Sequence, residues 1–544
     1  MAKTPTIPFQ DLEASQLEAL LERVGPLIQP QDFQLLQKVI TTLGLVLEWL
    51  QRKTLSLRRL RQMIFGPKTE KSSKLLSKTK DKDKATDPAL PSAGANGSTQ
   101  PKEKKKGHGR NGVDDYPGAQ RIAVPHQTLH AGCTCPICLK GRLYDMNKPA
   151  VIIRIVAQPI FPAKIFELMK LRCSRCLMVF TAQAPPEAGS SKYSQEVPAM
   201  LAILRYGMGL PLFRIEKLQQ SFGVPLPAAT QWELQWEAAQ LLMPILECLI
   251  QRAAQAWLFY HDDTPMKVLS LMEENASQAA QDPDSKERTG IFTTGILAEV
   301  GEHRIALFFT GRKHAGENLQ AVLDKRQEGL LKPIQMSDGL SSNKLKTAQT
   351  QEANCNAHSR RKYVGVLDAF PQECRFVLET LKEVYKNDAK AKELGLSPEE
   401  RLYSHQTHSQ KLMDALKQWA QEQIDQKKTE PNSGLGQAIS YMLKRWEKLT
   451  LFLRQPGAPL DNNLAEQILK RAILHRKNSM FYRNERGAMV GDLYMSLIET
   501  CRFCAVDPLE YLTAVQTHAR LLSKNPGQWL PWNFRATLVA TNTS

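Results

Sequence analysis

The sequence has no run of apolar residues as long as the roughly eighteen that a membrane helix requires. It also lacks the N-terminal series of basic, apolar and small residues that makes a secretory signal peptide. Ten cysteines among 544 residues are too few for a disulfide scaffold, and four of them form two Cys-x-x-Cys pairs. In a reducing compartment such pairs predict metal ligation. We therefore expect a cytoplasmic protein that makes no contact with a membrane.

Acidic residues are scarce relative to basic ones. There are 55 Asp and Glu against 72 Lys and Arg, which gives a formal net charge of +17, and the sequence pI is about 9.3. This surplus favours a polyanionic partner, of which nucleic acid is the commonest, although a basic solvated surface would give the same numbers. The chain is too long for one ordinary hydrophobic core, so we expect a multidomain protein.

Residues 31–65 carry a seven-residue apolar repeat, which predicts a short leucine-zipper-like coiled coil and thus a homo-oligomer. The repeat consists of Leu36, Leu43, Leu50, Leu57 and Ile64. The alternative is a helix that packs within its own domain. Residues 66–112 are rich in Lys, Ser, Asp, Pro and Gly, lack apolar periodicity, and predict a basic flexible linker. Such a linker either follows a DNA backbone or simply separates domains.

Two Cys-x-x-Cys pairs in residues 113–190 predict a zinc-binding domain with a zinc ribbon-like knuckle. The four thiols are Cys135, Cys138, Cys173 and Cys176. Two such turns supply the tetrahedral sulfur set that structural Zn²⁺ takes, and strands expected at residues 151–156 and 165–171 would bring them together. Unligated thiols are the alternative, because the spacing between the pairs is longer than in the commonest ribbons. Cys133 is a spare thiol that could replace Cys135.

Residues 197–256 have helical periodicity, with breaks at residues 207–211 and 223–227. Two of the expected helices, at residues 213–222 and 228–239, are separated by a turn at Gly223. This is the arrangement of a helix-turn-helix that docks on DNA. Ordinary packing of neighbouring helices is the alternative.

Residues 257–354 have the pattern of the first part of a ribonuclease H-like α/β core. The expected elements are a strand at residues 256–261 before Asp262, an antiparallel hairpin at 290–299 and 305–311, a helix at 314–325, and a strand at 333–337 before Asp338. Strand, hairpin, helix and strand, with an acid at the end of the first and of the last strand, is the plan of this fold.

Acids at the ends of two core strands suit phosphodiester chemistry. Cleavage must neutralise a doubly charged transition state, and two Mg²⁺ ions held by carboxylates do so. Since Mg²⁺ keeps several waters, three protein carboxylates are enough. The third is expected from a helix that packs on the sheet. Glu466 lies at the start of one such helix, for which Asp461 is the expected N-cap, and Glu499 in a second apolar helix is the alternative.

Five motifs follow one another in a characteristic order. They are His-Asp-Asp-Thr-Pro at 261–265, Ser-Asp-Gly at 337–339, Cys-Asn-Ala-His-Ser-Arg-Arg-Lys-Tyr at 355–363, Asp-Asn-Asn-Leu-Ala-Glu at 461–466 and Arg-Lys-Asn at 476–478. Together with the apolar repeat and the paired cysteines, they resemble the DDE transposases of the insertion sequence sixty-six family over nearly the whole chain. The chain departs from that family's usual pattern at Gln467, where Arg is usual, and at His475, where Gly is usual. Neither change removes an expected metal ligand.

The resemblance implies a bacterial, nucleoid-associated DNA transposase that binds the terminal inverted repeats of a mobile element, cuts there and joins the freed 3′ hydroxyls to target DNA. Carried over residue by residue, the catalytic acids are Asp262, Asp338 and Glu466, which would hold Mg²⁺ or Mn²⁺. The long separation between the last two implies a helical insertion at residues 355–455. A final core helix with C-terminal helices at 456–520 and a tail at 521–544 would follow. Small accessory proteins of the same element are implied as partners.

Other residues near the acids have two interpretations each. Cys355 and His358 form a Cys-x-x-His step that either binds metal or braces the core, and the absence of two further ligands favours bracing. Several basic residues are expected to contact phosphates, although some would simply be solvated. They are Arg360, Arg361, Lys470, Arg471, Arg476 and Lys477.

Two other functions fit the same pattern. A ribonuclease H-like nuclease would share the acids, the metal and the fold, but it would only hydrolyse DNA. A catalytically inactive, zinc-dependent DNA-binding protein would keep the cysteines, although intact Asp262, Asp338 and Glu466 argue against it.

Overall fold

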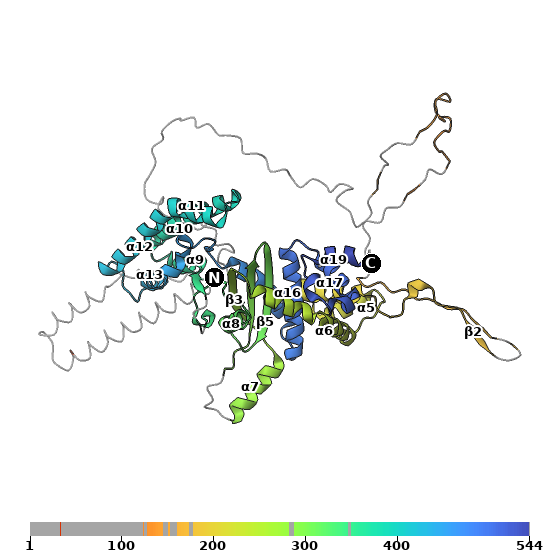
Figure 1. Cartoon of the computed structure of the whole chain (residues 1–544), viewed down its shortest axis with the longest axis horizontal. Helices are drawn as coiled ribbons and strands as arrows, with labels where there is room; N and C mark the ends of the chain where they lie inside the picture. The colour runs from red at the N-terminus through yellow and green to blue at the C-terminus, as the bar shows by residue number, and fades with distance from the viewer. Residues whose placement is uncertain are drawn as a thin grey trace, which may run out of the picture. The chain divides into compact units, whose positions relative to one another are not determined.

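The computed structural model describes residues 123–124, 128–144, 151–152, 160–172, 174, 178–281, 288–345, 347 and 350–542, besides Phe33. The chain divides into two compact units, Met1–Ala89 and Leu90–Ser544. The expected coiled coil, apart from Phe33, and the expected linker lie outside the described residues, and so do Cys173 and Cys176. Every helix and strand labelled in Figure 1 belongs to the second unit.

A five-stranded mixed sheet forms the centre of the second unit. Its strands are β3 (Leu258–Pro265), β4 (Phe292–Val300), β5 (His303–Gly311), β6 (Ile334–Ser337) and β7 (Gln351–Asn354). Their order in space is β5-β4-β3-β6-β7, with β4 antiparallel to β3 and β5, and with β6 parallel to β3 and β7. The mixed α/β fold was therefore predicted correctly, and this topology is compatible with a ribonuclease H-like core.

Apolar sequence and turn chemistry explain these strands. β3 and β4 are buried along most of their lengths, as expected of central strands. Gly301 lies in the turn between β4 and β5 with a φ of +56°, a left-handed conformation that glycine adopts without strain. The structure confirms the predicted hairpin, the helix after it (α8, Ala315–Leu323) and the strand that precedes Asp338.

Three local predictions differ from the structure. The first core strand does not end before Asp262, because β4 pairs with β3 as far as Pro265. Strand β7 was not predicted, since its sequence Gln-Glu-Ala-Asn contains no apolar run. Residues 165–169 are not a strand, and β1 (Lys170–Arg172) begins only after them, paired antiparallel with β2 (Val179–Thr181).

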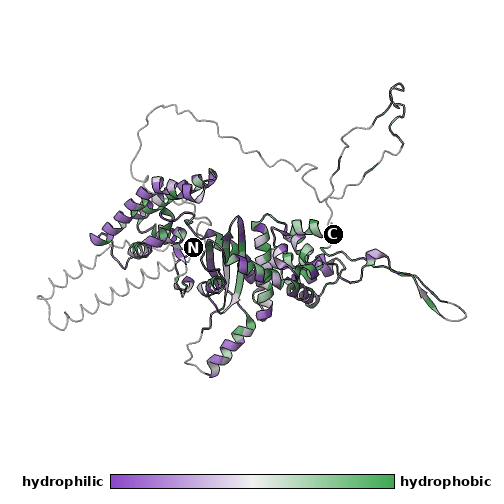
Figure 2. Ribbon diagram, viewed as in Figure 1, coloured by the Kyte–Doolittle hydropathy of each residue, from purple (hydrophilic) through white to green (hydrophobic). Residues whose placement is uncertain are grey.

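Two helices pack on the sheet near its centre and its edge. α15 (Asn463–Ser479) contacts β3 and β4, and α16 (Glu485–Phe503) contacts β5. Gly295 of β4 allows α15 to lie close to the sheet, since a Cβ at this position would be 3.0 Å from Leu469 Cδ2. Figure 2 shows many hydrophobic residues in the sheet and in α16. Apolar burial therefore fixes α15 against the strands that carry the site.

The start of α15 was predicted one residue too early. Its N-cap residue is Asn462, whereas the sequence favoured Asp461. The Asp461 carboxylate instead accepts a hydrogen bond from the Asn463 N–H at 3.1 Å. An Asp followed by two Asn residues offers several capping side chains, so the sequence alone does not decide which one occupies the cap.

Strand β5 is an edge strand, and α16 covers its free edge. Three α16 side chains, one helical turn apart, accept hydrogen bonds from alternate N–H groups of β5. Thr310 donates to Asp492 Oδ2 (2.7 Å), Phe308 to Ser496 Oγ (3.0 Å) and Ala306 to Thr500 Oγ1 (3.1 Å). We call Asp492, Ser496 and Thr500 the edge ladder. The edge ladder accepts hydrogen bonds from three backbone N–H groups of β5 that would have no protein partner if the edge were uncovered.

A group of helices follows β7 and precedes α15 in the chain. These helices are α9 (Asn356–Val366), α10 (Pro371–Glu393), α11 (Pro398–His408), α12 (Gln410–Asp425), α13 (Gly434–Lys444) and α14 (Trp446–Leu449), followed by the 3-10 helix η6 (Leu451–Leu453). Their apolar faces pack together, and Leu381, Met413 and Ile439 are buried. We call this group the helical insertion.

Helices before and after the sheet complete the described part of the unit. They are η3 (Pro186–Ala188), α4 (Glu196–Ala202), η4 (Ile203–Gly207), α5 (Leu212–Ser221), α6 (Ala228–Ala253), α17 (Pro508–Thr517), α18 (Ala519–Leu522), η7 (Pro526–Trp529) and α19 (Phe534–Asn542), while α7 (Leu269–Gln281) follows β3. The predicted breaks around Gly207 and Gly223 are present. The expected C-terminal tail contains η7 and α19, with Trp529 and Phe534 buried.

Candidate active site

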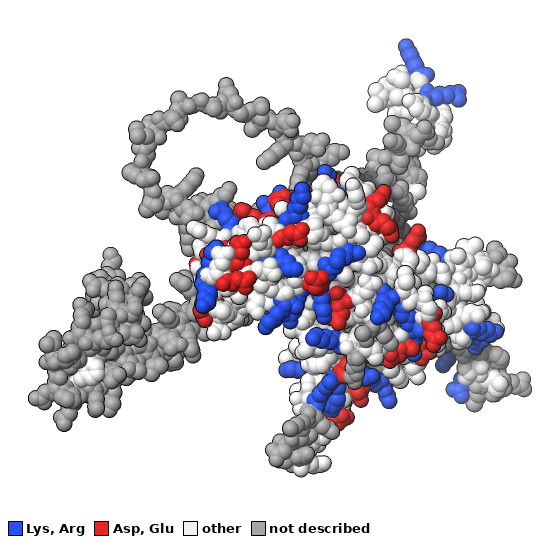
Figure 3. Space-filling model, turned by 60° about the vertical axis from the view of Figure 1, so that its left-hand side comes forward, with Lys and Arg blue, Asp and Glu red and all other residues white. Residues whose placement is uncertain are grey.

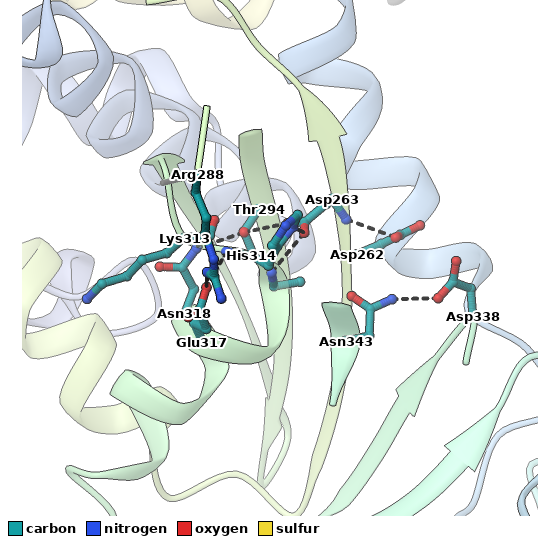
Figure 4. Close-up of polar contacts among 11 residues, drawn as sticks. Asp262, Asp263, Arg288, Thr294, Lys313, His314, Glu317, Asn318, Asp338 and Asn343 are labelled. Carbon is teal, nitrogen blue, oxygen red and sulfur yellow. Dashed lines mark hydrogen bonds and ion pairs between the residues drawn. The ribbon is translucent and has the colours of Figure 1, made fainter. Parts of the chain in front are cut away.

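Asp262 and Asp338 lie on neighbouring parallel strands. Asp262 is in β3, and Asp338 directly follows β6. The last pair in the β3–β6 register is Tyr260 with Met336. The same register extended by two residues brings the two aspartates level with one another. Figure 4 shows the Asp262 side chain directed from β3 toward Asp338.

Burial and like charge raise the pKa of the Asp262 carboxyl to about 7. Burial is the largest cause, and the neighbouring carboxylates of Asp338, Asp263 and Glu466 add to it. The Asp263 N–H opposes the rise by donating to Asp262 Oδ1 at 2.8 Å. Because the charges of Asp338 and Glu466 both act on Asp262, the three predicted acids are close enough to interact electrostatically.

The loop after β6 holds the Asp338 side chain in place. Its Oδ1 accepts hydrogen bonds from the Leu340 N–H at 2.9 Å and from Asn343 Nδ2 at 2.5 Å, and Asn343 ends the 3-10 helix η5 (Ser341–Asn343). The backbone carbonyl of Asp338 accepts a hydrogen bond from the Tyr441 hydroxyl of α13 at 2.8 Å. Asp338 is only 9% exposed. One oxygen of this buried carboxylate is therefore fixed by its own loop.

Glu466 lies in the first turn of α15, and the start of this helix is tied to β3. The N-cap residue Asn462 donates from Nδ2 to the His261 carbonyl at 3.0 Å. Its backbone N–H donates to Cys355 Sγ at 3.2 Å. The helix that carries the third predicted acid is thus anchored to the residue that precedes Asp262.

The Glu466 carboxylate faces two basic side chains of α9. Its Oε1 lies 3.6 Å from His358 Nε2 and 3.9 Å from Arg361 Nη2, and the side chain is 33% exposed. This oxygen forms no hydrogen bond with any described residue. In the part of the chain that the structure describes, no group of three or more His, Cys, Asp or Glu side chains is arranged to hold a metal ion. The three acids interact electrostatically without forming such a group.

Cys355 connects β6 with α15. Its N–H donates to the Ser337 carbonyl at 2.9 Å, while its thiol accepts the Asn462 N–H. Burial raises the pKa of this thiol to about 12, so it remains protonated near neutral pH. Cys355 therefore links the residue before Asp338 to the helix that carries Glu466. These contacts favour the bracing interpretation of the Cys-x-x-His step.

The second acid of His-Asp-Asp-Thr-Pro has a different environment from the first. Asp263 Oδ1 accepts a hydrogen bond from Thr294 Oγ1 at 2.6 Å. Its Oδ2 accepts the Ala315 N–H at 2.9 Å and lies 3.1 Å from His314 Nδ1 (Figure 4). Asp263 thus holds the start of α8 against β4. Sequence reasoning did not assign it this role, although successive strand residues point to opposite faces and only one of the two acids can face Asp338.

Two of the predicted DNA-binding arginines have their guanidinium groups engaged within the fold. Arg471 forms an ion pair with Glu499 and donates to the Gly207 carbonyl. Arg476 donates to Thr264 Oγ1 at 3.0 Å and to the Pro265 carbonyl, so it connects α15 with the end of β3. These contacts also give Glu499, the alternative third acid, a structural role. It is buried and forms ion pairs with Arg471 and with Arg502, the latter at 3.1 Å.

The other four predicted DNA-binding residues lie nearer to solvent. Lys470 and Lys477 are exposed on α15, whereas on α9 Arg361 is exposed and Arg360 is half-buried. On the face seen in Figure 3, basic side chains are interspersed with acidic ones and do not form one continuous patch. This face therefore presents no single broad basic surface to a DNA backbone.

The first of the two cysteine pairs lies in a tight turn. Cys135 donates its N–H to the Gly141 carbonyl at 2.8 Å, and the Gly141 N–H donates to Cys138 Sγ at 3.4 Å. Hydrogen bonds from the backbone of Lys140 and Gly141 lower the pKa of the Cys138 thiol. A turn with these properties suits a metal-binding thiolate. The second pair lies outside the described residues.

Comparison with known proteins gives the family. The sequence model described as Transposase IS66 family matches residues 190–490, which is 301 of the 544 residues. The chain belongs to the IS66 transposase family. This result confirms the resemblance drawn from the five motifs. The matched segment contains all three predicted acids and Cys355, whereas Cys135 and Cys138 precede it.

Relatives of this transposase occur in Sinorhizobium fredii (strain NBRC 101917 / NGR234). Uncharacterized protein y4hP is 25% identical over 452 residues, which covers 78% of this chain and 76% of the relative. Uncharacterized protein y4jD is 25% identical over 420 residues, which covers 74% of this chain and 78% of the relative. Among the described residues of this transposase, no helix combines the length and the apolar character that crossing a membrane requires.

Proposed function

We propose that this IS66 transposase binds the terminal inverted repeats of its element, cuts the DNA there, and joins the freed 3′ ends to a target. The observation that carries the proposal is the position of Asp262 and Asp338 at one level of two parallel strands, together with the anchoring of α15 to β3 through Asn462. The effect of the Asp338 and Glu466 charges on the pKa of Asp262 supports a common site for the three acids. Family membership supports a DNA transposase in general.

The donor set fits a divalent ion. Asp262, Asp338 and Glu466 offer only carboxylate oxygens, which are the ligands that Mg²⁺ and Mn²⁺ prefer. The raised pKa of Asp262 is a further argument, since a buried carboxyl among like charges gains most from a nearby cation. When bound, the ions would neutralise charge on the reacting phosphate and activate the attacking hydroxyl.

The chain's own residues would position these acids. Asn343 and the Leu340 N–H hold one oxygen of Asp338, and the Asp263 N–H holds one oxygen of Asp262. Asn462 and Cys355 fix the start of α15 and hence the position of Glu466. Glu466 faces His358 and Arg361, and we propose that these two side chains keep it oriented toward the site.

The remaining predicted features complete the proposal. Arg360, Arg361, Lys470 and Lys477 would contact DNA phosphates, whereas Arg471 and Arg476 act within the fold. Cys135, Cys138, Cys173 and Cys176 would hold one structural Zn²⁺. Self-association through residues 31–65 and small accessory proteins of the same element would assemble the complex on the DNA ends.

A single assay tests this function. Purified full-length transposase is incubated with Mg²⁺, a labelled duplex of the left end of its element, and a supercoiled target plasmid. We expect strands that end in a 3′ hydroxyl at the element boundary and a joined product in the plasmid. Asp262→Asn and Asp338→Asn should bind the duplex and give neither product. Cleavage by the wild type without any joined product would support the hydrolysing nuclease instead.

A further inference from the structure

A pocket of about 260 Å³ lies directly beside Asp338, at the point where the sheet meets the helical insertion. Its lining residues come from the end of β6 and the loop after it, from β7, and from the C-terminal end of α13 with the residues that follow. They include Gly339, Lys344, Glu352, Lys444, Arg445 and Lys448. Ser337 and Gly339, the two chain neighbours of Asp338, both line the pocket. Anything bound there lies next to a proposed catalytic acid.

The pocket carries an uncompensated positive charge. Four basic side chains line it against one acid, Glu352, and Lys448 forms an ion pair with that acid. Lys344 and Lys444 are exposed, and neither side-chain ammonium group has a hydrogen-bond or ion-pair partner among the described residues. Since exposed cations gathered in a hollow attract anions, the pocket favours a negatively charged ligand.

Contacts between the insertion and the loop after β6 fix the pocket relative to Asp338. Arg445 donates from Nη2 to the Gly339 carbonyl at 3.2 Å, and its guanidinium lies 4.0 Å from the Tyr441 ring centroid. The Tyr441 hydroxyl donates to the Asp338 carbonyl at 2.8 Å. Gly339 has a φ of +80°, and a Cβ there would be 2.9 Å from Arg445 Nε. A larger residue at this position would be strained by the positive φ and would displace the Arg445 side chain.

We propose that this pocket binds one backbone phosphate of the DNA, close to the phosphodiester bond that is cut, with Lys344 and Lys444 as the main contacts. This inference rests on the proposed function, which supplies DNA as the polyanion. Apart from Leu340, the lining residues are charged, polar or glycine, and no aromatic side chain lines the pocket among the described residues, which favours a phosphate over a base. The helical insertion is then part of the DNA-binding surface.

Salt dependence of DNA binding measures how many phosphates these lysines neutralise. Full-length Lys344→Ala/Lys444→Ala transposase would be titrated with the left-end duplex, without divalent ions, at several salt concentrations. The slope of log K against log[salt] should become less negative by about 0.9 for each phosphate that the variant no longer neutralises. Lys390→Ala/Lys411→Ala removes two exposed lysines of α10 and α12 that do not line the pocket, and should leave the slope unchanged. Lys344→Arg/Lys444→Arg keeps both positive charges and should therefore keep the wild-type slope.

Neutral methylphosphonate linkages, placed one at a time along the duplex, locate the phosphate. We expect one position near the cut site to weaken wild-type binding while leaving the Lys344→Ala/Lys444→Ala variant unaffected. The pocket proposal is wrong if the variant keeps the wild-type salt slope and its binding is weakened by the same methylphosphonate positions as wild-type binding. This holds even when the wild type cuts and joins DNA. If the slope and one position change as expected but the wild type never cuts DNA, the proposed function fails and the phosphate pocket stands. Failure of the wild type to bind the duplex would overturn both.

Discussion

The Asp492 carboxylate accepts two hydrogen bonds from Thr310, one from its backbone N–H and one from its hydroxyl, each 2.7 Å long. Helix α16 is thereby joined to the edge strand β5 through a carboxylate that is 8% exposed. Burial raises the pKa of Asp492 to about 7, although the two hydrogen bonds from Thr310 oppose the rise. The same contact thus satisfies the backbone of β5 and places a titratable group in the core.

Replacing Asp492 by Asn should stabilise the transposase at neutral and higher pH. The pKa of Asp492 is raised in the folded state, so this group lowers stability progressively as pH rises from about 4 to about 7. A difference of about 3 pKa units corresponds to about 4 kcal/mol at most. Asn keeps the hydrogen bond to the Thr310 N–H and carries no charge. Urea unfolding of both proteins at about pH 5 and pH 8 measures the effect.

The matched variant Asp492→Ala removes the acceptor as well as the charge. It leaves the Thr310 N–H without a partner, which costs about 1–3 kcal/mol. Asp492→Ala should therefore be less stable than Asp492→Asn at both pH values. An Asp492→Asn variant that gains no stability relative to the wild type between pH 5 and pH 8 would contradict the assignment of a raised pKa.

The third acid is tested by two Glu→Gln variants. Glu466→Gln should bind the element's end with normal affinity but cleave it about a thousandfold more slowly, because a carboxylate that holds metal contributes several kcal/mol of transition-state stabilisation. Glu499→Gln should still cleave. It should, however, lower the stability of the fold by about 3 kcal/mol, since Arg471 and Arg502 lose their buried partner.

Gel-shift, cleavage and thermal unfolding experiments separate these outcomes. If Glu499→Gln lost cleavage while its melting temperature stayed unchanged, Glu499 would be the catalytic acid and Glu466 would not. Normal cleavage by both variants at a temperature where both are folded would refute the three-acid mechanism.

Metal binding should depend on pH through Asp262. With a pKa of about 7, this carboxyl binds a proton below neutral pH, and the proton competes with a metal ion. The Kd for Mn²⁺ should therefore rise about tenfold for each pH unit below about 7, as one proton is displaced, and should level off above it. Electron paramagnetic resonance of free Mn²⁺ gives this Kd.

The Asp492→Asn variant is the control for this pH dependence. The pKa of Asp492 lies in the same range as that of Asp262, but Asp492 interacts with β5 and not with the proposed site. The variant should keep the wild-type pH profile. A Kd that does not change between about pH 5.5 and pH 7.5 would show that Asp262 is not a ligand.

Zinc content distinguishes the two kinds of cysteine. Cys138→Ser should lower the zinc bound to the full-length chain by about one ion, because one tetrahedral site uses all four knuckle thiols. Cys355→Ala should leave the zinc content unchanged. It should instead reduce stability by about 1–3 kcal/mol, since the Asn462 N–H loses its acceptor. Atomic absorption and urea unfolding measure both effects, and a lower zinc content in Cys355→Ala would support the metal-binding interpretation of the Cys-x-x-His step.

The sequence predicted those parts of the core whose own residues have a strong pattern. The strand before Asp262, the β4–β5 hairpin and α8 are apolar segments bounded by turn residues, so periodicity was sufficient to find them. Strand β7 was not found because Gln-Glu-Ala-Asn forms a strand only through pairing with β6, which is a tertiary effect.

Side-chain partners were harder to predict than elements. Nothing in the sequence decides that Arg471 pairs with Glu499 while Lys470 remains exposed, since both look like basic residues beside a catalytic helix. The roles of Asn343 and Tyr441 around Asp338 depend on contacts between residues 5 and 103 positions apart. Such contacts follow from the fold and leave no local signal.

The edge ladder limits how copies of this transposase associate. An open edge strand is a template on which a second chain can add a strand, and it is a common route to aggregation. The N–H groups of Ala306, Phe308 and Thr310 are already bonded to α16, so β5 cannot recruit another sheet unless this helix first moves away. Any multimer that brings two DNA ends together must therefore be built through surfaces other than the β5 edge.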